Sequence, residues 1–294
     1  MDRINRILEW GNCCRIKPIV YILSILLSSV VTLAAQRVAI LTPDNAVASQ
    51  SFAQKLEESL DGKGKMIDDS LSESAFESAK PEAPFNLSKE DSMRIGAVIG
   101  CDYFILLRSA TLRRSSFKRP EYYEANAVIY VVSSRTGRLV FWKLQKFEAN
   151  KIKEADKLLT KSIYPLAAEI SIKLNTTTKA EVSEPTPTSI EEVPNVNSPE
   201  EKNFREPIPF RRIKPEYTVV AGFYDIAAII DIVIDLDAAG MITRTEIVRW
   251  AGYGLEESVE KTVRQMNWRP AERNGKSLPM QFLVRYNFKK VDKE

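Results

Sequence analysis

The feature that most constrains the fold is an apolar pattern near the C-terminus that changes from a two-residue period to a helical spacing and back. Ile230–Leu236 alternates apolar and polar residues, and Leu278–Phe288 does so again, which is typical of strands with one packed face. Between them come a turn at Asp237–Gly240, a strand-like run over Ile242–Trp250 and an amphipathic stretch over Leu255–Met266. This order predicts a small β-β-α-β unit.

The last of these strands divides its side chains between two faces. One face carries Leu278, Met280, Phe282, Val284, Tyr286 and Phe288, and the other carries Pro279, Gln281, Leu283, Arg285 and Asn287. We expect the helix to cover one face of the sheet. The opposite face and at least one edge then remain open to a partner.

The same residues resemble the C-terminal domain of TonB-type energy transducers. The resemblance is carried by Leu255–Ala271, which ends in Trp-Arg-Pro-Ala, by Asn274–Pro279 and by the upstream turn Ile234–Gly240. It implies that residues 210–294 form a TonB C-terminal domain. In that family the domain lies in the periplasm and binds an extended segment of an outer-membrane TonB-dependent receptor by adding it to the sheet edge.

The resemblance also implies which residues bind the partner. The final strand would be the docking edge, and the segment Pro215-Glu216-Tyr217 would contact the same peptide, although Thr218 stands where the family has a second proline. The implied partner-binding residues are Pro215, Tyr217, Met280, Gln281, Phe282, Leu283, Val284, Arg285 and Tyr286. The alternative is that the final strand is only a core strand.

The N-terminus predicts export from the cytoplasm. Pro18–Ala35 carries no charge, and the residues before it carry an excess of Lys and Arg. Residues 1–36 are therefore a signal peptide or a signal anchor. The small residues Thr32–Ala35 favour cleavage, whereas TonB-like proteins normally keep their anchor. Either way the remainder is expected in the periplasm, free or anchored in the inner membrane.

Several kinds of chemistry are excluded by the composition. The chain has no histidine, so it can form neither a Ser-His-Asp or Cys-His site nor a histidine-ligated zinc or haem site. Only Cys101 follows the apolar stretch, and the net charge of +3 is too small to indicate nucleic-acid binding. We expect no catalytic residues, metal, cofactor or small-molecule substrate, and thus no enzyme. The histidine that TonB anchors use with inner-membrane motor proteins is also absent.

Residues 37–175 predict a separate α/β domain. The expected elements are strands over Arg37–Leu41 and Asp102–Leu107, helices over Phe52–Leu60 and Ser92–Ile99 with Gly100 as C-cap, a hairpin over Ala125–Ser133 and Arg138–Trp142, and a helix over Ala155–Leu174 kinked at Pro165. The pattern resembles the N-terminal domain of TolB and the CsgG-type envelope domains, which mostly bind other envelope proteins. A buried thiol is expected at Cys101.

The residues between these domains, 176–209, are rich in Pro and Glu and nearly free of aromatic residues. Such a segment buries too little apolar surface to offset the entropy of ordering. We therefore expect a disordered, extended linker. The overall fold class is α+β, with an N-terminal α/β domain and a small C-terminal β-β-α-β domain.

One stretch of the sequence has part of the spacing of a calcium-binding loop. Positions 1, 3, 6, 8 and 12 of such a loop correspond to Asp235, Asp237, Gly240, Ile242 and Glu246. Because position 5 is Ala239 and both flanks alternate as strands, a hairpin turn is favoured. Asp231 and Asp235 share the polar face of one strand, and without a pocket we expect them to be solvated surface groups.

Two functions remain open at this stage. The first is energy-coupled transport across the envelope, with the C-terminal domain binding an outer-membrane receptor by strand addition. The second is a non-transporting envelope scaffold that uses both domains for protein contacts. The missing histidine and a linker placed behind a folded domain favour the second function, and the C-terminal pattern favours the first.

Overall fold

The computed structural model describes residues 36–184, 190–194 and 203–289, all of which belong to one compact unit, Gln36–Glu294. The expected export segment therefore lies outside the described residues, apart from Gln36. In the part of the chain that is described, no helix is both long enough and apolar enough to cross a membrane.

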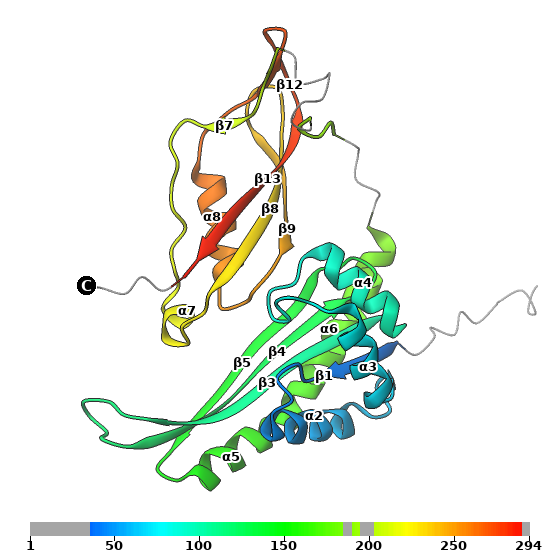
Figure 1. Ribbon diagram of the computed structural model, residues 1–294, viewed down its shortest axis with the longest axis vertical. Helices are drawn as coiled ribbons and strands as arrows, with labels where there is room; N and C mark the ends of the chain where they lie inside the picture. Colours follow the sequence, from blue (N-terminus) through cyan, green and yellow to red (C-terminus); the bar gives the residue numbers. More distant parts are fainter. Residues whose placement is uncertain (1–35, 185–189, 195–202, 290–294) are drawn as a thin grey trace, which may run out of the picture. The chain divides into compact units, whose positions relative to one another are not determined.

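The N-terminal part is built on a five-stranded sheet with the order β2-β1-β3-β4-β5 (Figure 1). Its strands are β1 (Arg37–Leu41), β2 (Lys65–Met66), β3 (Tyr103–Arg114), β4 (Tyr122–Ser133) and β5 (Leu139–Ala149). The pairs β1–β2 and β1–β3 are parallel, and β3–β4 and β4–β5 are antiparallel. Parallel strands followed by a long hairpin confirm the predicted α/β architecture.

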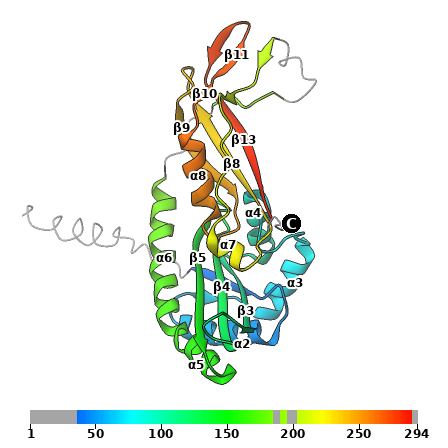
Figure 2. The ribbon, with the colours of Figure 1, turned by 90° about the vertical axis from the view of Figure 1, so that its left-hand side faces the viewer.

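The two faces of this sheet are covered by different helices. The helices of this part are α2 (Val47–Leu60), α3 (Asp69–Ala79), α4 (Lys89–Ile99), α5 (Ile152–Lys161) and α6 (Ile163–Ser183). Tyr103, Ile105 and Leu107 pack with α2, α5 and α6, whereas Phe104 and Leu106 belong to the cluster that includes residues of α3 and α4. Figure 2 shows α6 and α4 on opposite sides of the sheet. Successive side chains of a strand point to opposite faces, so one strand serves both cores.

Several helices of the N-terminal part differ from the expectation. One kinked helix was expected over 155–174, but the helix is broken at Ser162, which ends α5 and precedes α6. Pro165 is the third residue of α6, where its missing N–H removes no intrahelical bond. The helix α6 also continues past 176, where the linker was expected to begin, because Thr178 and Glu181 bond to Gln36 and Arg135. The helix α3 was not predicted.

Other N-terminal predictions are confirmed. The helix α4 ends at Gly100, which has the left-handed backbone conformation of a C-cap glycine. Cys101 is buried, and desolvation raises the pKa of its thiol to about 11.

The C-terminal part has the predicted β-β-α-β order. A three-stranded sheet of order β13-β8-β9 is formed by β8 (Ala228–Leu236), β9 (Ile242–Arg249) and β13 (Met280–Phe288), and α8 (Leu255–Gln265) packs on one face (Figure 2). The helix α8 buries Leu255, Val259 and Val263 as its spacing predicts. A short helix, α7 (Val219–Phe223), precedes β8.

Short strands at one end of this sheet were not predicted. They are β6 (Phe204–Arg205), β7 (Ile208–Pro209), β10 (Trp268–Arg269), β11 (Ala271–Arg273) and β12 (Lys276–Leu278). Because β6 pairs with β11 and β7 with β10, residues 204–209 belong to the C-terminal part. They were expected to be part of the linker.

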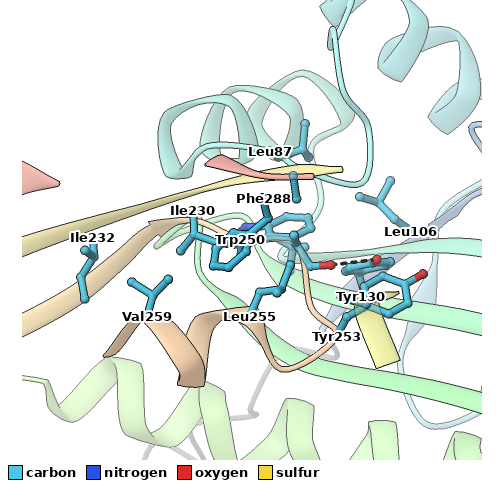
Figure 3. Packing of buried hydrophobic residues seen from close by; sticks show 14 of the residues in the cluster. Leu87, Leu106, Tyr130, Ile230, Ile232, Trp250, Tyr253, Leu255, Val259 and Phe288 are labelled. Carbon is cyan, nitrogen blue, oxygen red and sulfur yellow. Dashed lines mark hydrogen bonds between the residues drawn. The ribbon is translucent and has the colours of Figure 1, made fainter. Parts of the chain in front are cut away.

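Side chains from both parts of the unit form a single apolar cluster. Figure 3 shows Leu87, Leu106 and Tyr130 from the N-terminal part with Ile230, Ile232, Trp250, Tyr253, Leu255, Val259 and Phe288 from the C-terminal part. The Tyr130 hydroxyl donates a hydrogen bond of 3.0 Å to the carbonyl of Ala251. The side chain of Asn86 donates to the carbonyls of Ile229 and Trp250 and accepts from the N–H of Ile229.

Candidate functional site

The strand β13 lies at the edge of its sheet, with β8 as its one full-length neighbour (Figure 1). It pairs with β8 over its whole length without a bulge, from Met280 opposite Leu236 to Phe288 opposite Ala228. Met280 is fully buried, Phe282, Val284 and Tyr286 are half-buried against the core, and Leu283 is 52% exposed. The predicted division of the strand into a packed and a wet face is confirmed.

The backbone of Gln281 shows which groups of β13 point to the open side. Its N–H donates to the carbonyl of Glu191 (2.8 Å), and its carbonyl accepts from the N–H of Val193 (3.2 Å). Both Glu191 and Val193 lie on the side of β13 away from β8. In an antiparallel pair the residues alternate between those that bond the neighbour and those that point away. The backbone groups of Leu283, Arg285 and Asn287 therefore face the same open edge as those of Gln281.

A groove of about 830 Å³ runs beside this edge. Its walls come from the linker (Glu192 and Val193), from the segment around β7 (Glu206–Pro209, Arg212 and Ile213), from Met266 and Trp268 after α8, from Glu90 and Val233, and from Gln281–Tyr286 of β13. The groove is therefore about half apolar, and beyond Gln281 no described residue pairs with the strand backbone that borders it. Such a surface suits an extended peptide.

The β8–β9 turn lies against Trp268, one of the residues that line the groove. Gly240 has φ of +83°, and a Cβ there would lie 2.3 Å from the carbonyl oxygen of Trp268. The Asp237 side chain accepts hydrogen bonds from the N–H groups of Ala239 and Met241. The predicted hairpin turn is thus confirmed, with Asp237 used for the turn itself.

The face of the sheet opposite α8 carries a network of ion pairs. Arg285 makes a two-pronged contact with Asp231 (2.7 and 2.8 Å), and Arg249 contacts the same carboxylate at 3.1 Å. Asp235 accepts from Gln281 at 2.7 Å and pairs with Arg244. Both aspartates are buried, each residue being 3% exposed, so the expectation of solvated surface groups was wrong. Long side chains from β9 and β13 fold over them and exclude water.

Burial and pairing act in opposite directions on Asp231. Burial disfavours its charged form, but the hydrogen bonds and charges of Arg285 and Arg249 outweigh that effect, so the pKa of Asp231 is lower than its ordinary value. The same bonds hold the side chains of Arg285 and Gln281 against their own sheet. At this edge the backbone groups and the side chain of Leu283 are therefore exposed without an ion pair of their own to hold them.

Pro215 and Tyr217 lie apart from the groove. The Tyr217 hydroxyl donates to the carbonyls of Ala221 and Ile226, and its ring stacks on Phe288 at the far end of β13. Pro215 is buried. Of the residues expected to bind a partner, the groove brings together those from Gln281 to Tyr286. Met280 contributes no exposed side chain.

The groove residues that come from other segments were not predicted from the sequence. Glu191–Val193, Ile208, Pro209 and Trp268 approach β13 only because short strands fold back beside it. Strands of two residues carry no period that a sequence pattern could reveal. Among the described residues, no cluster of acidic and cysteine side chains suits a metal ion.

Comparisons with known proteins agree with the C-terminal architecture. Residues 214–289 match the family model described as the Gram-negative bacterial TonB protein C-terminal. A search of curated protein sequences finds no match.

Solved structures with similar folds include three bacterial proteins. The hypothetical protein CT253 from Chlamydia trachomatis is 11% identical, with 48% of this chain and 99% of that one covered and a TM-score of 0.33. The TonB C-terminal domain of Pseudomonas aeruginosa is 16% identical over 34% of this chain and 94% of that one, with a TM-score of 0.26. The LpoB C-terminal domain from Salmonella enterica is 12% identical over 45% and 93%, with a TM-score of 0.27.

Likeness at this level says nothing about shared activity, and the similarity of residues 37–175 to TolB and CsgG-type domains stays a prediction. The family match spans about a quarter of the chain. On that match, residues 214–289 are similar to the C-terminal domain of TonB, as the alternating strands and the helix between them predict.

Proposed function

We propose that this protein acts in the cell envelope by binding an extended segment of an outer-membrane receptor along the open edge of β13. The observation that carries the proposal is the row of backbone groups at Leu283, Arg285 and Asn287 on the side of β13 away from β8, of which the first two residues line the groove. A peptide laid there completes hydrogen bonds that water otherwise satisfies. The family match of residues 214–289 supports this role, which requires no catalytic group.

The exposed side chain of Leu283 offers a direct test. A photoreactive phenylalanine analogue is placed at Leu283 in the full-length protein, and proteins crosslinked in the native envelope are identified by mass spectrometry. The control carries the analogue at Phe117, which is fully exposed in the β3–β4 loop. Receptors of the outer membrane crosslinked from Leu283 and not from Phe117 support the proposal. Equal crosslinking from both positions would contradict it.

A second function, an envelope scaffold without transport, is favoured by one specific observation. The apolar cluster around Trp250 and Tyr130 joins the C-terminal part to the N-terminal sheet, so the TonB-like part is not held by the linker alone. A transducer has to reach across the periplasm, and a C-terminal domain that moves freely on a linker is better suited to that task. Crosslinking of periplasmic or cell-wall proteins alone from Leu283 would support the scaffold instead.

A further inference from the structure

A short piece of the linker lies on the edge of β13. The two hydrogen bonds of Gln281 hold Glu191 and Val193, and they make a parallel bridge between Glu192 and Gln281. This is the bond pattern that an added parallel strand makes. The contact fills the first of these backbone positions, and within the described part of the chain nothing pairs with those at Leu283, Arg285 and Asn287.

Side chains fix this piece of linker in register. The Glu191 carboxylate pairs with the guanidinium of Arg273 on β11. Val193 is half-buried and lines the groove, whereas Glu192 is exposed. The contact therefore has a charged and an apolar component besides its two backbone bonds.

The residue after this piece is a proline on the outer side of the added segment. Pro194 follows Val193 and falls opposite Leu283 if the bridge is extended by two residues. At that position the backbone nitrogen points away from β13. A proline there leaves no N–H on the outer side, so it discourages a further strand from pairing with the linker itself.

We propose that Glu191–Val193 is a tethered competitor that occupies the docking edge until a partner strand displaces it. The inference rests on the proposed function, because it concerns the same edge. Two backbone hydrogen bonds and one exposed ion pair are worth together about a tenfold preference for the occupied state. A partner that pairs along the whole of β13 makes more bonds than the linker does, and it therefore replaces the linker.

The test compares proline at two adjacent positions of the full-length chain. Val193→Pro removes the N–H that binds the Gln281 carbonyl, whereas the N–H of Glu192 points away from β13. Glu192→Pro is therefore the matched control, and Val193→Ala keeps the N–H while shortening the side chain. The first readout is hydrogen exchange of the Gln281 amide, which the Glu191 carbonyl protects.

Because the proline ring also clashes with the Gln281 carbonyl, the whole segment should leave the edge. We therefore expect Val193→Pro to speed exchange at Gln281 about tenfold and Glu192→Pro to leave it unchanged. The second readout is the affinity of a labelled synthetic peptide with the sequence of residues 188–195, which should bind the Val193→Pro variant about tenfold more tightly than the unaltered chain. Equal Gln281 exchange in both proline variants, or equal peptide affinity for the altered and unaltered chains, would overturn the proposal.

The two proposals fail in different ways. If Val193→Pro frees the Gln281 amide but the Leu283 crosslinker still captures no receptor, the linker occupies the edge and the receptor-binding function is wrong. If the crosslinker captures a receptor equally well from the Val193→Pro variant and from the unaltered chain, the edge binds a partner and the linker does not compete.

Discussion

At the scale of single residues, Gly240 shows how one backbone position supports the groove. The glycine combines a left-handed conformation with close contact to the Trp268 carbonyl, and Trp268 lines the groove. Gly275, in the β11–β12 turn, has a similar φ of +75° but no atom within 4 Å of an added Cβ. Comparing the same substitution at Gly240 and at Gly275 therefore separates the cost of the left-handed backbone from the cost of steric overlap.

We predict that Gly240→Ala lowers the free energy of unfolding more than Gly275→Ala does. The change at Gly275 costs only the left-handed conformation, about 1 kcal/mol, whereas the change at Gly240 also displaces the Trp268 carbonyl and costs about 3 kcal/mol in all. Urea unfolding followed by circular dichroism measures both values. Equal losses would show that the turn yields to the added methyl group.

Asp231 leads to a prediction about pH. Its pKa is lowered in the folded protein, so its ion pairs stabilise the fold above the unfolded pKa of about 3.9 and lose that effect as the pH falls through the lower, folded pKa. We predict that Asp231→Asn costs about 1–2 kcal/mol at pH 7, because Arg285 is partly exposed. The difference from the unaltered protein should shrink below pH 4, measured by urea unfolding at each pH. A difference independent of pH would show that the pairs with Arg285 and Arg249 contribute no stability.

At the scale of elements, the direction of each N–H in β13 decides which substitution tests partner binding. The N–H groups of Phe282 and Val284 point toward β8, because those of Gln281 and its alternate neighbours point outward. Proline at Phe282 or Val284 therefore breaks the β8–β13 ladder and damages the fold itself. Proline at Leu283 removes only an outward donor, a position that edge strands tolerate.

We predict that Leu283→Pro reduces receptor capture by about tenfold, with circular dichroism close to that of the unaltered protein. The matched control is Leu283→Ala, which keeps the N–H and loses the exposed side chain. Capture is compared by retention of envelope proteins on the immobilised full-length variants. If alanine reduces capture as much as proline does, the Leu283 side chain rather than the backbone carries the recognition.

The elements that the sequence predicted well are those in which a periodic pattern of apolar residues continues over many residues. Apolar and polar residues alternate along the strands β8 and β13, and apolar residues recur at helical spacing along α8. Packing on one face of each element therefore leaves a clear pattern in the sequence. The helix α3 and the strands β6, β7, β10, β11 and β12 were not predicted. The strands β7 and β10 pair with each other although they lie far apart in the sequence. The local sequence pattern of either strand does not show that pairing. The strand β13 was predictable because its apolar and polar residues alternate, whereas the linker contact at Gln281 was not. Partner binding at the edge of β13 stays a prediction.

At the scale of the whole described unit, Asn86 links the two parts at one point. It lies in the loop between α3 and α4, where its side chain makes three hydrogen bonds, of 2.7, 2.8 and 2.8 Å, to the backbone of Ile229 and Trp250. Those two residues belong to β8 and to the segment after β9. The shared apolar cluster surrounds them, so the two parts should unfold together.

We predict that Asn86→Ala lowers the free energy of unfolding by about 2–3 kcal/mol, because three hydrogen bonds are lost and the Ile229 N–H is left without its acceptor. Asn175→Ala, at an exposed position on α6, is the control and should change little. Circular dichroism and tryptophan fluorescence are followed through urea unfolding, since Trp142 and Trp250 pack beside this cluster. If the two signals change at the same urea concentration, and both shift to lower urea in Asn86→Ala, the two parts form one cooperative unit. Two separate transitions in the unaltered protein would mean that the TonB-like part folds independently, and that result would weaken the case for a scaffold and strengthen the case for a transducer.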